Sequence, residues 1–396
     1  MKLKLTLLSA AALGLISTSA SAVDWGGYTR IGPGQKQTGG DGSRCFDGGG
    51  VAGAGSQAPG HGGIGRLGNE CNTYGEFALS QGMSAGGVQY KALLMTNFFN
   101  TGSDSSLSTS VNQLYVEGKG YDIAPNQTFW IGRRFYHRAD VHFDDSFYVN
   151  MSGTGAGVDG IGVGGGSLSI AAFRTSDDTV GGNAGSRLNV DLEKIPVNPG
   201  GMLRLTADFT KFSGPGGKNG VGLSLQHDQS GVFGADNTLW LQFAKGSASL
   251  NMAFGDGTAD SDNKSWRIAD TLTWKNGPLS GSALVHYGRA EEPDGLGGKF
   301  KTKTFSIGGR AAYAMTNNFK LQAELGTANT KPDGGSSQNV TKITFAPTLT
   351  VGPNFFDRPE LRFYVSHFSM NDAYRIANGQ SKKTKTAAGF QAEIWF

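Results

Sequence analysis

Residues 319–325, Phe-Lys-Leu-Gln-Ala-Glu-Leu, carry an apolar side chain at every second position and a polar or charged one between. Successive side chains of an extended strand point to opposite faces, so this stretch predicts a β-strand with one apolar and one polar face. The same two-residue period returns along the chain at 203–210, 304–313, 361–366 and 390–396. No stripe with the 3.6-residue period of a helix competes with it. The sequence therefore predicts an all-β protein.

The segments between the predicted strands alternate in length. Tight turns recur at 82–87, 123–127, 164–166, 198–201, 232–237, 276–278, 316–318 and 352–354, with longer stretches rich in Gly, Ser, Asp and Asn between them. Eight turns and nine long loops imply eighteen strands, with both chain ends on the short-turn side. Short turns, long loops and an apolar outer band are typical of an outer-membrane barrel, and an open sheet edge could not lie in lipid. We therefore predict an 18-stranded antiparallel transmembrane β-barrel.

The composition agrees with a single sheet whose apolar side chains face outward. Of 396 residues, 63 are glycine and only 38% are hydrophobic, too few for the several separate cores that this length usually contains. Yet 24 Phe, 11 Tyr and 6 Trp are spread along the chain. A low hydrophobic content together with many aromatic residues argues against an ordinary α/β enzyme. A secreted all-β adhesin would share the alternation, but it would need a second layer to cover the apolar faces.

The first 22 residues resemble a secretory signal peptide. Lys2 and Lys4 precede an apolar stretch at 5–16, and residues 20–22, Ala-Ser-Ala, form a cleavage site. We therefore divide the chain into a signal peptide, 1–22, and one barrel domain, 23–396, exported to the outer membrane of a Gram-negative bacterium. After residue 22 no run of about 18 apolar residues predicts a membrane helix. Removing the signal leaves 33 basic and 32 acidic residues, a balance unlike that of a nucleic-acid binder. Cys45 and Cys71 could form a disulfide in an oxidising compartment, and two free thiols are the alternative.

No catalytic or cofactor motif stands out. Residues 155–160 fit the dinucleotide fingerprint G-x-G-x-x-G, but no βαβ unit surrounds them, and 63 glycines make such a match expected by chance. His137 and His142 would face opposite sides of an extended strand, which makes a poor metal pair. No Ser/His/Asp cluster supports a hydrolase inside the barrel. We therefore expect no enzymatic activity, no cofactor and no metal.

Aromatic side chains at polar positions indicate a function. Tyr28, Tyr74 and Trp395 share strand faces with charged residues such as Arg30 and Glu76. The first, second and last strands are neighbours in a closed barrel, so the three aromatic rings would lie on one wall. Aromatic faces suit the apolar faces of pyranose rings, while charged groups can hydrogen-bond the hydroxyls. The pattern predicts sugar binding, and the alternative is that these rings merely fill space.

At these residues the sequence resembles the maltoporin family of sugar-specific outer-membrane porins. The resemblance spans most of the chain after residue 22. Its clearest blocks are 23–28 (Val-Asp-Trp-Gly-Gly-Tyr), 66–71 (Arg-Leu-Gly-Asn-Glu-Cys), 134–142 (Arg-Phe-Tyr-His-Arg-Ala-Asp-Val-His), 198–201 (Asn-Pro-Gly-Gly) and 393–396 (Glu-Ile-Trp-Phe). It implies a homotrimer of eighteen-stranded barrels in outer-membrane lipid. It also implies a first loop pinned by the Cys45–Cys71 disulfide and a third loop folded inward as the constriction.

The resemblance also implies site residues. Tyr28, Tyr74, Phe356 and Trp395 match an aromatic slide, and Arg30, Arg66, Glu76, Arg138, Asp140 and Asp145 match a polar track for sugar hydroxyls. Phe147 matches the constriction tyrosine without its hydroxyl, Asn112 replaces an arginine of the track, and residues 101–110 carry no aromatic. The implied function is facilitated diffusion of maltose- or maltodextrin-like oligosaccharides. The alternative is a general-diffusion porin for small hydrophilic solutes, which charge rings alone could tune.

Overall fold

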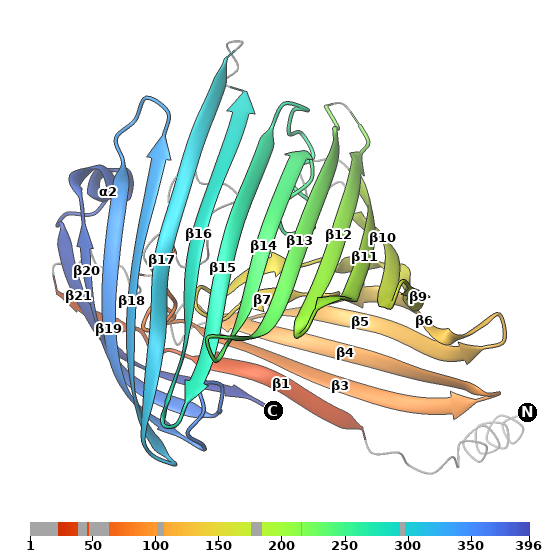
Figure 1. Ribbon diagram of the computed structural model, residues 1–396, viewed down its shortest axis with the longest axis horizontal. Helices are drawn as coiled ribbons and strands as arrows, with labels where there is room; N and C mark the ends of the chain where they lie inside the picture. Colours follow the sequence, from red (N-terminus) through yellow and green to blue (C-terminus); the bar gives the residue numbers. More distant parts are fainter. Residues whose placement is uncertain are drawn as a thin grey trace, which may run out of the picture.

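The computed structural model describes residues 23–38, 46, 63–100, 107–175, 184–214, 216–293 and 298–396. All of their strands except two, at 139–141 and 146–149, form one closed antiparallel ring (Figure 1). β1 (Asp24–Ile31) pairs with β3 (Thr73–Ala85) on one side and with β21 (Thr384–Trp395) on the other, which closes the sheet. β2 (Gln35–Thr38) continues β1 along β21. With β1 and β2 counted as one strand, the described residues form the predicted 18-stranded barrel, without an open edge.

The other strands of the ring follow one another in chain order. They are β4 (Val88–Asn100), β5 (Ser108–Tyr121), β6 (Ala124–Arg134), β9 (Gly153–Val163), β10 (Gly166–Thr175), β11 (Gly185–Asn198), β12 (Gly201–Phe212), β13 (Asn219–Val232), β14 (Ala235–Gly246), β15 (Lys264–Asn276), β16 (Leu279–Pro293), β17 (Lys299–Thr316), β18 (Phe319–Pro332), β19 (Gln338–Thr350) and β20 (Glu360–Met370). Each strand pairs with the next in this order, so the ring contains no crossover.

The short turns are confirmed at seven of the eight predicted places, but the connection 351–359 is longer than the predicted turn at 352–354 and longer than 333–337, which was expected to be a long loop. Two-residue turns join the strands at 86–87, 122–123, 164–165, 199–200, 233–234, 277–278 and 317–318. Gly86 and Gly87 both have positive φ, at 58° and 82°, which is the backbone that a two-residue hairpin turn requires. The chain end after β21 lies at the barrel end that carries these turns (Figure 1).

The barrel is polar inside and apolar outside. On β18, Lys320, Gln322 and Glu324 are at most 1% exposed, whereas Leu325 is 55% exposed. On β19, Lys342 is fully buried beside the exposed Ile343. Buried polar side chains alternating with exposed apolar ones reverse the pattern of a soluble sheet and suit a barrel surrounded by lipid. The predicted assignment of the two strand faces is therefore confirmed.

On the outer face of the barrel, aromatic contacts join the first strands to the last residue of the chain. Phe396 contacts Trp25 and Phe77 with ring centroids 4.9 and 5.9 Å away, and Phe77 stacks on Phe98 at 5.1 Å. The backbone of Phe396 exchanges two hydrogen bonds with Gly27, at 2.9 and 3.1 Å. The last residue thus belongs to the ring closure.

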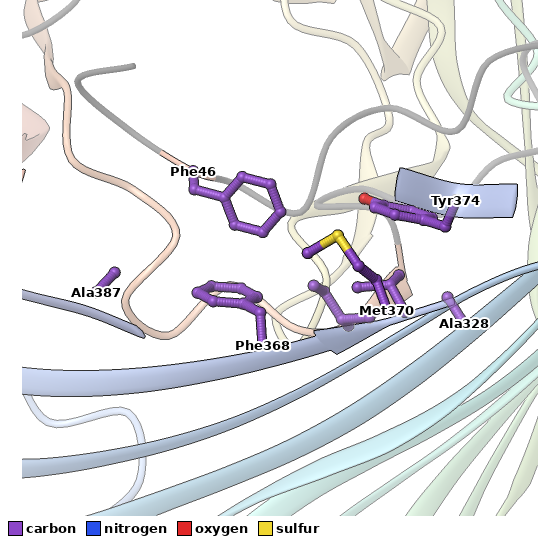
Figure 2. Close-up of a cluster of buried hydrophobic side chains, with 8 residues drawn as sticks. Phe46, Ala328, Phe368, Met370, Tyr374 and Ala387 are labelled. Atoms are coloured by element: carbon purple, nitrogen blue, oxygen red, sulfur yellow. The ribbon is translucent and has the colours of Figure 1, made fainter. Parts of the chain in front are cut away.

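A short helix, α2 (Asp372–Ala377), was not predicted by the sequence. It begins after Asn371, whose side chain accepts a hydrogen bond from the backbone N–H of Tyr374, as helix caps do. Tyr374 belongs to a buried cluster in which Phe46 packs edge-on against Phe368 at 4.6 Å (Figure 2). Through this cluster, Phe46 of the first long connection packs against α2 and the last strands of the barrel. Among the described residues, no helix is both long and apolar enough to cross a membrane.

The connection from β6 to β9 reaches strands far along the ring. It contains the hairpin β7 (Ala139–Val141) and β8 (Ser146–Val149). Tyr148 stacks on Trp240 of β14 at 4.8 Å, and the guanidinium of Arg267, on β15, lies 4.3 Å from the Tyr148 ring. Gln242 donates a hydrogen bond to the Tyr148 carbonyl at 2.6 Å. Residues 135–152 therefore contact the polar face of strands that are not their neighbours in the ring.

Candidate functional site

Most of the site residues implied by the sequence line a single cavity of about 420 Å³. The implied residues that line it are Tyr28, Arg30, Arg66, Tyr74, Glu76, Arg138, Asp140, Asp145, Phe147 and Trp395. Two of them come from β1, two from β3, one from β21, and the rest from the connections 39–72 and 135–152. Strand register accounts for one wall, because Tyr28 is paired with Glu76 on one side and Trp395 on the other. The structure thus gathers side chains that are far apart in the sequence.

Three of the implied aromatic residues, Tyr28, Tyr74 and Trp395, line this cavity, and they are called the aromatic row below. The Tyr28 and Tyr74 rings are 6.2 Å apart, and Trp395 sits across the strand register from Tyr28. Phe356 does not line the cavity, but its ring lies 5.4 Å from that of His142, which in turn lies 6.3 Å from Trp395.

A network of ion pairs lies behind the cavity wall that Tyr28 and Trp395 form. Arg66, 4% exposed, contacts Glu70 at 2.8 Å and Glu393 at 2.9 Å. Arg30 also contacts Glu70, at 2.5 Å, and the Tyr28 hydroxyl donates to Glu393 at 3.1 Å. Each buried charge therefore has a partner, which a buried ion needs. Sequence reasoning did not assign Glu70 or Glu393 a role, although Glu393 lies on the polar face of the last strand.

Asn112, at the position where the resemblance implies an arginine, contacts the cavity residues Tyr74 and Glu76. Its amide nitrogen donates to Glu76 and to the Tyr74 hydroxyl, both at 3.3 Å. The Tyr74 hydroxyl itself donates a short hydrogen bond to Glu76. Glu76 is thereby held in one orientation by two neutral donors. The substitution removes a positive charge from this wall but keeps a hydrogen-bond donor.

Arg138 faces these groups from the connection 135–152. Its guanidinium lies 3.9 Å from the Phe135 ring and 4.4 Å from the Phe147 ring, so two aromatic faces hold the cation. Phe147 lacks the hydroxyl of the implied tyrosine but retains the ring that supports Arg138. Burial and the nearby Asp145 raise the pKa of Asp140 above its ordinary value, while Arg138 opposes that rise. The cavity therefore holds cationic and anionic groups side by side.

His142 also lines the cavity, and the sequence analysis did not assign it. Its ring nitrogens lie 3.3 Å from Arg66 and 3.2 Å from Arg358. Burial and the charge of Arg66 hold the pKa of His142 well below its ordinary value. The imidazole is therefore neutral and accepts a hydrogen bond from one of the two arginines. The motif at 134–142 contained this residue, but its role depends on arginines distant in the chain.

Three features considered in the sequence fall wholly or partly outside the described residues. Cys71 is buried, but Cys45 lies outside the described ranges, so their disulfide stays a prediction. The signal peptide at 1–22 and the segment 101–106 of the second loop also lie outside them.

Comparison with known proteins places this architecture in a family. Residues 23–396 match the family model described as LamB porin. A maltoporin of Hahella chejuensis (strain KCTC 2396) is 30% identical over 417 residues, covering 98% of this chain and 96% of that protein. The crystal structure of OccD3 (OpdP) of Pseudomonas aeruginosa superposes with a TM-score of 0.52 at 10% identity, covering 96% of this chain and 92% of that one, which shows a shared fold. The family match spans the barrel and the cavity residues together, and the chain belongs to the LamB porin family.

Proposed function

We propose that this protein is a sugar-selective channel of a Gram-negative outer membrane, through which maltose- or maltodextrin-like oligosaccharides diffuse passively. Family membership and the relative named maltoporin support a porin that passes sugars. The observation that carries the proposal is the cavity itself, where a row of aromatic rings lies beside paired cationic and anionic groups. A filter that sorts solutes by size and charge would need no such row.

The proposed mechanism follows from the two kinds of group. The apolar faces of successive glucose rings stack on Tyr28, Tyr74 and Trp395. Sugar hydroxyls that lose water in the narrow path form hydrogen bonds with Arg30, Glu76 and the other charged groups of the cavity. Each protein–sugar bond replaces a sugar–water bond, so binding is modest and reversible, as conduction requires. Neighbouring aromatic surfaces let a ring leave one contact as it gains the next.

The connection 135–152 is the proposed constriction, as an inward-folded third loop. Its contacts with Trp240, Gln242 and Arg267 support this assignment, since these side chains lie on the polar face of β14 and β15. The same connection contributes Arg138, Asp140, Asp145 and Phe147 to the cavity. A loop held at both walls would narrow the path where the polar groups converge.

Three further features belong to this proposal. They are assembly as a homotrimer, cleavage of the signal peptide after residue 22, and the disulfide between Cys45 and Cys71. Light scattering of the detergent-solubilised protein measures the oligomer. Intact mass with and without reductant measures the processed N-terminus and the disulfide.

Liposome swelling tests the proposed function. Liposomes containing the protein are exposed to mono-, di- and trisaccharides and to sugar alcohols of matched size. A sugar channel admits glucose oligomers faster than their hydrodynamic size allows. Rates that follow size alone for every solute would favour the general-diffusion porin.

A further inference from the structure

A polar cluster next to the cavity surrounds His137, which does not itself line the cavity. The backbone of His137 is left-handed, with φ at 43°, a conformation that costs a side-chain-bearing residue free energy. Such a residue persists where its surroundings hold it. Three polar contacts do so here, of which the longest joins His137 Nε2 and the Asp159 carboxylate at 3.9 Å. The His137 Nδ1 atom lies 2.6 Å from the Asp191 carboxylate, and Arg204 donates to the His137 carbonyl at 2.9 Å.

Asp191 is itself fixed. It is 1% exposed on β11, and Arg204 of β12 donates to both of its oxygens, at 2.8 and 3.0 Å. The Thr206 hydroxyl donates to the first oxygen at 2.8 Å. The His137, Asp191 and Glu193 ligand atoms lie within 4.8 Å of one another, but Arg204 and Thr206 already occupy the Asp191 oxygens. The cluster therefore acts as a hydrogen-bonded anchor on two barrel strands.

The residue before His137 is held as firmly. The Tyr136 ring is 1% exposed and lies 4.8 Å from Trp130 and 4.1 Å from the imidazole. Its hydroxyl donates a short hydrogen bond to Asp159 of β9. At the start of the connection 135–152, Tyr136 is therefore packed in a buried cluster, and His137, in a left-handed conformation, is held by its polar contacts, which form a clamp.

Arg138 follows directly and points to the cavity. Because φ and ψ of His137 set the direction in which the chain leaves the clamp, they also set where the Arg138 guanidinium lies. We propose that Asp191 is a positioning residue for sugar recognition, which holds His137 in its left-handed conformation and thereby aims Arg138 into the cavity. This inference rests on the proposed function, since it assigns a specificity role within the same site.

The test is a double-mutant cycle read on sugar blockade of single-channel current. Asp191→Ala removes the acceptor of His137 and should raise the dissociation constant of a maltooligosaccharide about tenfold, which corresponds to about 1.4 kcal/mol. Asp191→Asn keeps one oxygen that can face the imidazole but puts an NH2 group in place of the oxygen that accepts from the Arg204 Nε–H and from Thr206, so it should restore only part of the affinity. In an Arg138→Ala background, Asp191→Ala should add little, because the residue through which it acts is already gone.

Asp228→Ala is the matched control. Asp228 is a partly buried carboxylate on β13 that accepts hydrogen bonds from Gln226 and Thr238, both outside the connection 135–152. Its removal should leave sugar affinity unchanged. His137→Gln provides a second disruption of the clamp if Asp191→Ala fails to assemble, and it should weaken binding in the same direction.

The outcomes separate the inference from the proposed function. Unchanged affinity in Asp191→Ala, or effects of the two substitutions that simply add, would overturn the positioning role while leaving a sugar channel in place. A wild-type channel without saturable sugar blockade would instead refute the proposed function. The cycle is repeated on the reversal potential in a salt gradient with His137→Gln in place of Asp191→Ala, because this substitution leaves the Asp191 carboxylate in place, and additivity with Arg138→Ala there again overturns the inference.

Discussion

Removing the indole of Trp395 tests the aromatic row directly. Trp395 is 37% exposed in the cavity, where its ring lies 4.4 Å from the Arg358 guanidinium. An aromatic contact contributes about 0.5–1.5 kcal/mol beyond simple burial. Trp395→Ala should therefore raise the dissociation constant for a glucose oligomer about two- to tenfold. Ion conductance should stay similar or rise slightly, because the side chain leaves the solute path.

The barrel should still assemble in this variant. Phe396 keeps its ring contacts with Trp25 and Phe77 and its backbone bonds to Gly27. Arg358 keeps its carboxylate partner Glu393 at 2.8 Å. Heat modifiability on a denaturing gel verifies the fold before any binding measurement.

The assay is a titration of single-channel current with glucose oligomers of increasing length. The loss should grow with oligomer length, because a longer chain contacts Tyr28, Tyr74 and Trp395 together while glucose contacts one ring. Phe390→Ala is the matched control, since Phe390 lies on the opposite face of the same strand and is 63% exposed. Equal affinity in Trp395→Ala and wild type for every oligomer would refute the stacking role.

Three further predictions concern the charged groups. Arg138→Ala should weaken sugar blockade more than it changes conductance, and a change in ion selectivity alone would make the cavity an electrostatic filter. Because burial and Asp145 raise the pKa of Asp140, acidification should neutralise this carboxylate before ordinary ones, whose pKa is about 3.9. The reversal potential in a salt gradient, followed from pH 7 to pH 4, should therefore begin to shift towards anion selectivity at a higher pH in wild type than in Asp140→Asn, and identical profiles would contradict the prediction. The buried Lys342 ammonium lies 2.7 Å from the Glu324 carboxylate. Glu324→Gln removes this negative charge and should lower the free energy of unfolding by about 3–5 kcal/mol. An unchanged midpoint in a denaturant titration would contradict this prediction.

The sequence predicted the architecture because that architecture depends on local pattern. Alternation assigns each strand its outer and inner face, and lipid makes the apolar face the exposed one, as Leu325 and Ile343 show. Turn residues such as Gly86 and Gly87 mark the hairpins independently of the rest of the chain. Closure then places Tyr28 beside Trp395, so the aromatic wall also follows from the sequence.

The parts that sequence reasoning missed depend on contacts between distant residues. His142 looks unremarkable as one position of an extended motif, and only the fold places it between Arg66 and Arg358. Glu70 becomes a partner of Arg30 because β1 and the first long connection meet at the cavity. The left-handed backbone of His137 has no local sequence signal, since it is the Asp191 clamp that holds it.

A blockade titration of the wild-type channel with maltose, maltotriose and longer glucose oligomers is the most direct test of sugar selectivity. A path that combines stacking with hydroxyl recognition predicts saturable blockade whose affinity rises with oligomer length until the aromatic row is filled. Current reduction that never saturates and depends only on solute size would contradict a binding path and leave a general-diffusion pore.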